Sequence, residues 1–460
     1  MSSRTDKAGL LVELRRRLSG MVLDPADKPY ERARRVWNAA IDRRPAAIAV
    51  CADAEDVALA VRIAADHGSP LTVRAGGHNV AGRSVADDAL LIDLSRLRHV
   101  TINTENRIAS VQGGALWHDV DLAGAAHGLF TTGGLVSSTG VGGFTLGGGT
   151  GWLMRKHGLA IDNLIGAEVI LADGRHMSAS AADNAELFYA LRGGGGGLGV
   201  ITRFDFNLYR VQRVLAGIVI RPLSEASAAL SLFRDFAAQA PEDYCGMMVL
   251  TRAPALPFLD AAWHGQPVCI SAMCWSGELA AGERALEPLR RSGTVLVDHV
   301  GPVSYVQWQH TQDAGAPAGR HQYWKTSCHR RLSDAAIELL VEFARESEFP
   351  HTELHVQHLG GAVAAVPDAA TAFAAREAGY FVNLIGITPW PEEFPALRAS
   401  IRALHDRLLP EAMPTLLPNF ISQDDGDPVL QLGDEKSERV AAIRRRYDPK
   451  GFFSSTVAKA

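Results

Sequence analysis

The chain has 460 residues, a formal net charge of -5 and 47% hydrophobic residues. A length beyond the roughly 250 to 300 residues at which single hydrophobic cores stop growing predicts more than one domain. With 21% charged residues and no long run of like charges, the composition gives no electrostatic reason to bind nucleic acid.

The N-terminus and the cysteines bear on the compartment. Residues 1–20 place apolar and basic residues at helical spacing and lack an unbroken apolar stretch, so we expect neither a signal peptide nor a membrane span. The five cysteines are scattered, without CxxC or His/Cys ligand spacing, which predicts reduced thiols and no metal site. These features favour a cytoplasmic protein.

The first regular elements read as a strand, a helix and a second strand. AIAVC (residues 47–51) is typical of a buried strand, and residues 52–67 have the apolar spacing of a helix with Asp53 as N-cap. The stretch LTVR (residues 71–74) then reads as a strand. It leads into the loop RAGGHNVAGRS (residues 74–84), which has one histidine directly after a glycine pair.

Further strands follow this loop. ALLIDLSRL (residues 89–97) and RIASVQGGA (residues 107–115) have strand-like composition. The stretch at residues 164–180 predicts a hairpin with Asp173 and Gly174 at its turn.

The segment TTGGLVSSTGVGGFTLGGGTGW (residues 131–152) is long and rich in glycine. A glycine costs about 1 kcal/mol relative to alanine inside regular structure, so this density needs a compensating reason. A flexible linker is one interpretation, although interleaved Val, Phe, Leu and Trp are not typical of linkers. The other is a set of tight turns that lets backbone N–H groups touch a planar or phosphorylated ligand.

A second glycine run, RGGGGGLGVIT (residues 192–202), contains a formal GxGxxG. A dinucleotide fingerprint must follow a strand and open a helix, whereas here a helix-like AELFYAL precedes the glycines and a strand-like VITRFDFNL follows them. No lysine follows a glycine run at P-loop spacing. A Rossmann or P-loop site is therefore not expected.

Together, RAGGH, the long segment ending GGGTGW, LRGGGGGLGVIT and the C-terminal RRRYDPKGFF resemble the FAD-linked oxidases of the berberine bridge enzyme-like group, in the vanillyl-alcohol oxidase and p-cresol methylhydroxylase superfamily. The resemblance runs from about residue 51 to the C-terminus. It implies an α+β fold in which a two-part FAD-binding domain accompanies an antiparallel-sheet substrate domain backed by helices. The implied parts are residues 1–213, 214–404 and the return segment 405–460.

The resemblance gives the histidine of the first loop a role. In such enzymes it is joined through its imidazole to the flavin 8α-methyl group, and His78 holds that position. Without the flanking glycines, a loop histidine hydrogen-bonded to backbone is the plainer interpretation. Val136 stands where doubly linked relatives carry a cysteine, and Phe144 where they often carry a histidine. We therefore expect FAD held by a single covalent bond, as in a subset of bacterial members.

Other residues of these segments are expected to contact FAD. The alternative for each glycine is a turn with positive φ and no ligand contact. The predicted contacts, besides His78, Val136 and Phe144, are Arg74, Gly76, Gly77, Asn79, Gly82, Thr139, Gly140, Gly142, Gly143, Gly149, Val200, Ile201 and Asn419.

From about residue 214 the pattern changes to strand-like stretches alternating with helical ones, such as residues 280–291 and 334–347. LAGIVI, CGMMVLT, VCISAMCW, ELHVQHL and FVNLIGI predict an antiparallel sheet backed by helices. The resemblance implies that this sheet covers the flavin and supplies the substrate pocket.

The strand HTELHVQHLGG (residues 351–361) carries the predicted catalytic groups. Glu353, His355 and Gln357 share one face of a period-two pattern. An ordinary amphipathic strand that faces solvent shows the same alternation. The family position favours a pocket wall, with Glu353 or His355 as the proton acceptor.

Four further positions are weaker pocket candidates. Tyr323 and Trp324 lie in QYWKTS, where core packing is an equal alternative. Asn383 lies on a neighbouring strand. Asn419 lies where members of the family carry a YxNY-like motif close to the flavin. This chain lacks the first tyrosine of that motif, which leaves the role of Asn419 open.

The expected function is hydride transfer from an alcohol or amine carbon of a small, secondary-metabolite-like substrate to flavin N5, followed by reoxidation with O2 to give H2O2. A flavin dehydrogenase with another acceptor and a non-catalytic flavin-binding protein are the alternatives. Expected partners are the small-molecule substrate and O2, with no nucleic acid, no membrane and no metal, in a monomer or homodimer.

Overall fold

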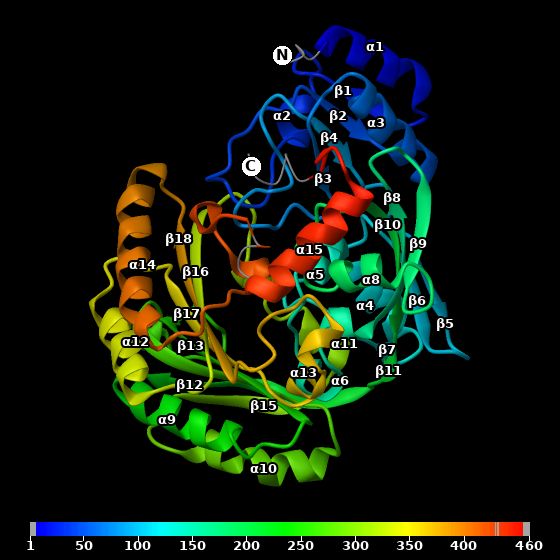
Figure 1. The fold of residues 1–460 in the computed structure, drawn as a ribbon. Coiled ribbons are helices and arrows are strands. Elements are labelled where there is room, and N and C mark those ends of the chain that lie inside the picture. Colours follow the sequence, from blue (N-terminus) through cyan, green and yellow to red (C-terminus); the bar gives the residue numbers. More distant parts are fainter. Residues whose placement is uncertain (1–5, 428, 430–431, 454–460) are drawn as a thin grey trace.

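A computed structural model describes residues 6–427, 429 and 432–453. Within this part of the chain, no helix is both long and apolar enough to cross a membrane. Helices and mainly antiparallel sheets make up the molecule, which confirms the predicted α+β class (Figure 1).

The first sheet lies near the N-terminus and has the order β1-β2-β4-β3. Strands β2, β4 and β3 run parallel, and β1 is antiparallel to β2. Helix α3 connects β2 and β3, and its N-cap Asp53 accepts a hydrogen bond from the backbone N–H of Asp56, as the sequence predicts. The elements are α1 (Lys7–Arg17), β1 (Met21–Leu23), α2 (Tyr30–Ala33), β2 (Ala47–Val50), α3 (Ala54–Asp66), β3 (Leu71–Arg74) and β4 (Leu90–Asp93).

The second sheet is fully antiparallel, with the order β5-β6-β10-β8-β9. Its strands are β5 (Val100–Asn103), β6 (Ile108–Gln112), β8 (Leu164–Ile170), β9 (His176–Ser180) and β10 (Val200–Asn207). The predicted hairpin is confirmed as β8 and β9, and Gly174 at its turn has a φ of 77°. Associated short elements are α4 (Trp117–Ala125), β7 (Leu129–Phe130), α5 (Val141–Leu146), α6 (Met154–His157), α7 (Ala160–Asn163), α8 (Ala185–Leu191) and β11 (Tyr209–Arg210).

The third sheet has seven antiparallel strands in the order β15-β12-β14-β13-β17-β18-β16. Helices cover its outer face, on the left and at the bottom of Figure 1. The strands are β12 (Arg213–Pro222), β13 (Tyr244–Arg252), β14 (Pro267–Trp275), β15 (Val297–Ser304), β16 (His321–His329), β17 (Glu353–His358) and β18 (Tyr380–Thr388). The helices of this region are α9 (Ala226–Ala237), α10 (Leu279–Arg291), α11 (Tyr305–Gln309), α12 (Asp334–Glu346), α13 (Ala362–Ala365) and α14 (Phe394–Leu408).

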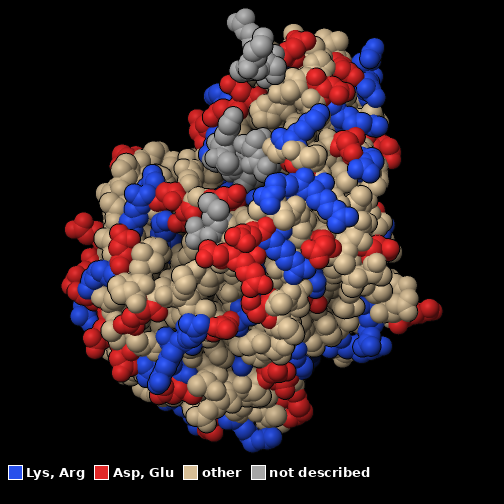
Figure 2. Space-filling model, viewed as in Figure 1, with Lys and Arg blue, Asp and Glu red and all other residues tan. Residues whose placement is uncertain are grey.

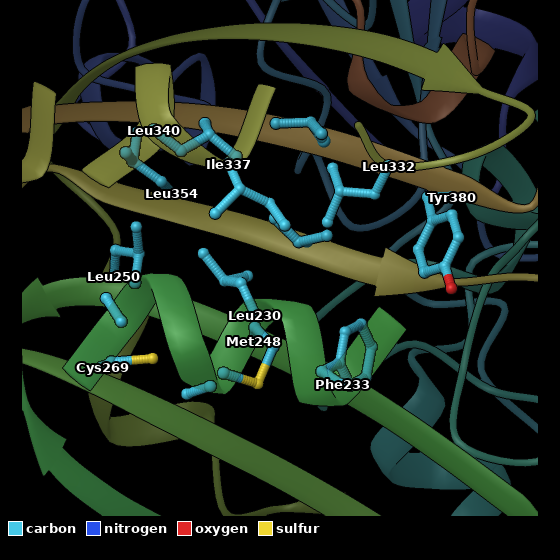
Figure 3. Close-up of a cluster of buried hydrophobic side chains, with 14 of the residues drawn as sticks. Leu230, Phe233, Met248, Leu250, Cys269, Leu332, Ile337, Leu340, Leu354 and Tyr380 are labelled. Atoms are coloured by element: carbon cyan, nitrogen blue, oxygen red, sulfur yellow. The ribbon is translucent and has the colours of Figure 1, made fainter. Parts of the chain in front are cut away.

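Alternation along the strands decides which face of this sheet meets the helices. Leu354 and Val356 of β17 are 1% and 0% exposed and pack with Leu230, Ile337 and other side chains from the helices (Figure 3). Removing this apolar surface from water stabilises the helix layer on the sheet. Glu353, His355 and Gln357 consequently point to the opposite face.

The C-terminal segment returns to the first half of the chain. Helix α15 (Asp434–Tyr447) packs against α8, and its Val440 and Ile443 join the core of the second sheet. The strand-forming range of the third sheet, residues 213–388, ends before this return.

The division of the chain at residues 213 and 404 stays a prediction.

One buried arginine joins the two halves of the chain. Arg155 of α6 is 4% exposed and donates to the backbone carbonyl oxygens of Ala240, Pro241, Tyr244 and Leu359, all from the region of the third sheet. These bonds satisfy buried acceptors that would otherwise lack partners.

Surface charges give no sign of a nucleic-acid interface on the face in view. Figure 2 shows Lys and Arg interspersed with Asp and Glu over this face rather than gathered into one basic stripe.

Candidate active site

One cavity of about 1000 Å³ runs between the glycine-rich loops and the inner face of the third sheet. Its size matches the upper range of small-molecule and cofactor pockets. Both glycine runs of the sequence and the predicted catalytic strand contribute to its walls. The cavity therefore brings together segments more than 250 residues apart in the chain.

At the loop end, the backbone itself forms the wall. A Cβ atom added to Gly76 would lie 2.3 Å from the backbone nitrogen of Gly140, and a Cβ on Gly140 would lie 2.3 Å from the nitrogen of Gly76. Only glycine permits this approach of the RAGGH loop to the segment before α5. The result is a smooth surface on which a flat group has access to peptide N–H groups.

His78 lies at this end, held by two neighbouring side chains. Its ring stacks on Trp37 at a centroid distance of 4.8 Å and an interplanar angle of 20°. Its Nε2 lies 2.8 Å from the Ser138 hydroxyl oxygen. Burial lowers the pKa of His78 to about 4, and the negative charge of Asp313 opposes this shift. The imidazole is therefore neutral near pH 7 and can act as a nucleophile.

The opposite wall is the sheet, and it has two halves. Strands β12, β13 and β14 present mainly apolar side chains, namely Ile218, Met247, Val249, Ile270 and Ala272, and β13 also presents Thr251 and Arg252. Strands β17 and β18 present Glu353, His355, Gln357 and Asn383, together with Phe381 and Ile385.

The polar half contains a carboxylate and an imidazole in contact. Glu353 Oε2 lies 2.8 Å from His355 Nε2, and the two side chains are 32% and 15% exposed. His355 is paired in register with Asn383, whose Oδ1 accepts a hydrogen bond from Thr326. The pair of Glu353 and His355 offers a proton acceptor within the cavity.

Several buried polar atoms of the wall lack protein partners. Gln357 is 2% exposed, and its Nε2 makes no hydrogen bond to any described residue. The same holds for Thr72 Oγ1, Ser84 Oγ and Trp308 Nε1, all on residues that line the cavity. An unsatisfied buried polar group costs about 1 to 3 kcal/mol, so these atoms indicate a polar ligand. A dinucleotide with a polar isoalloxazine fits both these atoms and the glycine cradle.

Most of the predicted cofactor contacts line the cavity together with His78. They are Gly76, Gly77, Asn79, Val136, Thr139, Gly140, Gly142, Gly143, Phe144, Val200, Ile201 and Asn419. Of the weaker pocket candidates, Trp324 and Asn383 also line it, whereas Tyr323 is 4% exposed in the helix-side core and donates to Asp424.

Three predicted contacts do not line the cavity, and the structure gives each of them another role, so their contact with FAD stays a prediction. Arg74 is buried in an ion pair with Asp93 and also bonds the carbonyl oxygen of Arg35. Gly82 turns the chain with a φ of 69° and sits against Ile41. Gly149 has a φ of 82° and donates its N–H to Asn419.

Asn419 therefore has a positioning function as well as a place in the wall. Its side-chain oxygen accepts from Gly149, and its Nδ2 donates to the carbonyl oxygen of Phe144 at 2.9 Å. These bonds fasten the C-terminal return segment to the glycine-rich segment.

The sequence prediction missed several wall residues. Trp37, Thr72, Ser84 and Trp308 belong to no recognised motif. Gly195, Gly196 and Gly197 lie in the second glycine run and also line the cavity. The spacing of the glycines in this run does not show which of them face the cavity.

Comparisons with known proteins agree with this geometry. Residues 45–180 match the family model "FAD binding domain". Glucooligosaccharide oxidase of Sarocladium strictum is 28% identical, over 92% of this chain and 88% of the relative. (R)-6-hydroxynicotine oxidase of Paenarthrobacter nicotinovorans is 32% identical, over 63% of this chain and 62% of the relative.

The solved structure of 6-hydroxy-D-nicotine oxidase from Arthrobacter nicotinovorans is 26% identical and has a TM-score of 0.83, over 95% of this chain and 96% of that one. The fold, the family model and the full-length relatives thus point to one group of enzymes. The chain thus contains a FAD-binding domain and is similar, over nearly its whole length, to FAD-linked oxidases of the berberine bridge enzyme-like group in the vanillyl-alcohol oxidase and p-cresol methylhydroxylase superfamily.

Proposed function

We propose that the protein is an oxidase that carries FAD on His78 and oxidises an alcohol or amine carbon of a small organic substrate. The observation that carries the proposal is that His78 and the pair of Glu353 and His355 line opposite walls of one cavity. FAD supplies the redox chemistry when bound, because it accepts a hydride at N5 and passes both electrons to O2, which gives H2O2.

A single attachment point is part of the proposal. Val136 lines the cavity where doubly linked relatives carry a cysteine, and valine forms no thioether. All five cysteines of the chain are buried, and none of them lines the cavity. His78 is therefore the nucleophile that we assign to the flavin.

The residues of the polar wall would position and deprotonate the substrate. Glu353 or His355 takes the proton from the substrate hydroxyl or amine as the hydride leaves the neighbouring carbon. The buried Nε2 of Gln357 is available to donate to a polar atom of the substrate or the cofactor.

The two halves of the sheet favour a compact, largely apolar substrate with one polar reactive group. Such a molecule would place its apolar body against β12 to β14 and its polar group against β17. An oligosaccharide against Met247, Val249 and Ile270 would leave hydroxyl groups without partners, which costs about 1 to 3 kcal/mol each. A secondary metabolite or a cyclic amine fits this description.

The test is anaerobic mixing with a panel of alcohols, cyclic amines and oligosaccharides, followed by admission of air. We expect an apolar alcohol or amine to bleach the absorbance near ~450 nm, and air to restore it within seconds with one H2O2 per substrate. Bleaching without reoxidation by air would make the protein a dehydrogenase. Failure of every compound to bleach the flavin would favour a binding protein.

A further inference from the structure

We infer that Ser138, with Trp37, positions His78 for its attachment to the flavin by holding Nε2 and leaving Nδ1 as the reacting nitrogen. This inference rests on the proposed covalent bond. It assigns a task to Ser138, which lies in the glycine-rich segment but does not line the cavity.

The hydrogen-bonding pattern of the ring distinguishes its two nitrogens. Nε2 lies 2.8 Å from the Ser138 hydroxyl oxygen, whereas Nδ1 has no hydrogen bond to any residue of the described ranges. When the hydroxyl oxygen accepts from Nε2–H, the lone pair of the neutral imidazole is on Nδ1. The ring is then in the tautomer that Nδ1 attack requires.

Trp37 fixes the plane of the ring. It stacks on His78, its backbone N–H donates to the carbonyl oxygen of Gly77 at 3.1 Å, and its indole N–H donates to Ala316 at 3.1 Å. The stack and the Ser138 bond together restrict both rotations of the His78 side chain.

The adjacent Ser137 has a different hydrogen-bond partner. The backbone N–H and the hydroxyl group of Ser137 both donate to Asp313 at 2.7 Å. The hydroxyl of Ser137 is thus engaged with the region of the third sheet, and that of Ser138 with His78. This difference between two adjacent serines provides a matched control.

The attachment reaction shows where Ser138 acts. A bond forms between Nδ1 and the flavin 8α carbon, an 8α C–H bond and the imidazole N–H bond break, and the two electrons and two protons released reduce O2 to H2O2. As Nδ1 is alkylated, the ring becomes positively charged before it loses the Nε2 proton. The hydrogen bond to Ser138 is then charge-assisted and stronger than in the neutral ring, so it favours the transition state.

The experiment follows covalent incorporation into full-length protein produced under flavin starvation and then given FAD. Acid-stable flavin is measured against time for the wild type, Ser138→Ala, Ser138→Thr and Ser137→Ala. Because Ser138 is exposed and water competes for its place, we expect Ser138→Ala to slow incorporation by about 3- to 10-fold. Ser138→Thr, which keeps the hydroxyl, and Ser137→Ala should incorporate FAD at nearly the wild-type rate.

Non-covalent affinity for FAD separates positioning from general damage. We expect the Kd of Ser138→Ala, measured by fluorescence before incorporation, to stay within about twofold of the wild type. Incorporation into Ser138→Ala at the wild-type rate, or equal slowing in Ser137→Ala, would overturn the role of Ser138. An absence of acid-stable flavin in the wild type would instead refute the proposed covalent bond, and the inference would fall with it.

Discussion

The two walls of the cavity differ in the atoms that form them, which are mainly backbone atoms at one end and side chains at the other. At the loop end, backbone atoms of Gly76 and Gly140 form the surface, and side chains are excluded by the close approach of two segments. At the sheet end, side chains from all seven strands of the third sheet form the surface, and the backbone only sets their spacing. We infer that the cofactor wall tolerates little change in any member of the family, whereas the substrate wall can be rebuilt one side chain at a time.

The largest effect is expected from a methyl group at the loop end. In Gly76→Ala the new Cβ would lie 2.3 Å from the nitrogen of Gly140, so two backbone segments must move apart. We expect purified Gly76→Ala to contain no FAD, as measured by its visible spectrum. Gly301→Ala is the control, because nothing lies within 4 Å of a Cβ added there, and it should keep its full flavin content. Normal FAD in Gly76→Ala would remove the distinction between the two walls.

A large effect on catalysis alone is expected at the sheet end. Glu353→Gln keeps the size of the side chain but cannot accept a proton, so we expect kcat to fall by about 100- to 10,000-fold with FAD content unchanged. The rate is measured with whichever compound bleaches the flavin anaerobically. Glu346→Gln, on the exposed surface of α12, should have the wild-type rate. A wild-type kcat in Glu353→Gln would leave His355 as the proton acceptor.

The hydrogen bonds by which Arg155 joins the two halves of the chain are expected to affect stability. Arg155→Met keeps most of the side-chain volume but leaves buried carbonyl oxygens without donors, so we expect a loss of about 3 kcal/mol in the free energy of unfolding. Urea denaturation measures it. Arg291→Met removes an exposed ion pair with Glu287 and should change stability by less than about 0.5 kcal/mol. Equal stability of both variants would mean that Arg155 does not join the halves.

The smallest effect concerns pH. Burial, and then the charge of Arg155, lowers the pKa of His358 at the end of β17 to about 3. Between that pKa and the ordinary value near 6.5, only the unfolded state binds the proton, so folding loses stability as pH falls. We expect the free energy of unfolding to fall by about 2 kcal/mol more in the wild type than in His358→Gln between pH 7 and pH 5. Identical losses would show that His358 titrates normally.

The same contrast explains what could be predicted from the sequence. The cofactor wall is made of glycines in short segments, and the tight turns and close approaches they permit are visible as motifs. The resemblance of these motifs to those of FAD-linked oxidases assigned the segments around His78 and Gly140 to FAD. Period-two alternation correctly placed Glu353, His355 and Gln357 on one face of β17. The surface that this face meets depends on contacts across the chain, so only the family resemblance pointed to the cavity.

Two edge strands, the neighbours of His78 and the ion pair of Arg74 could not be predicted from the sequence. Strands β15 and β16 form the two edges of the third sheet, where the alternation is weakest, and β15 contains Pro302. Trp37 and Ser138 contact His78 through space, and the sequence pattern of neither segment shows this contact. Arg74 is a predicted FAD contact, and the structure pairs its side chain with Asp93 on the neighbouring strand, a contact that the motif does not show.

The most direct test of the account is acid precipitation of the purified protein, followed by washing and a spectrum of the pellet. We predict that the wild-type pellet retains flavin absorbance near ~450 nm and that the pellet of His78→Ala is colourless, although His78→Ala binds FAD before precipitation. Flavin released into the supernatant by the wild type, or retained in the pellet by His78→Ala, would contradict attachment through His78.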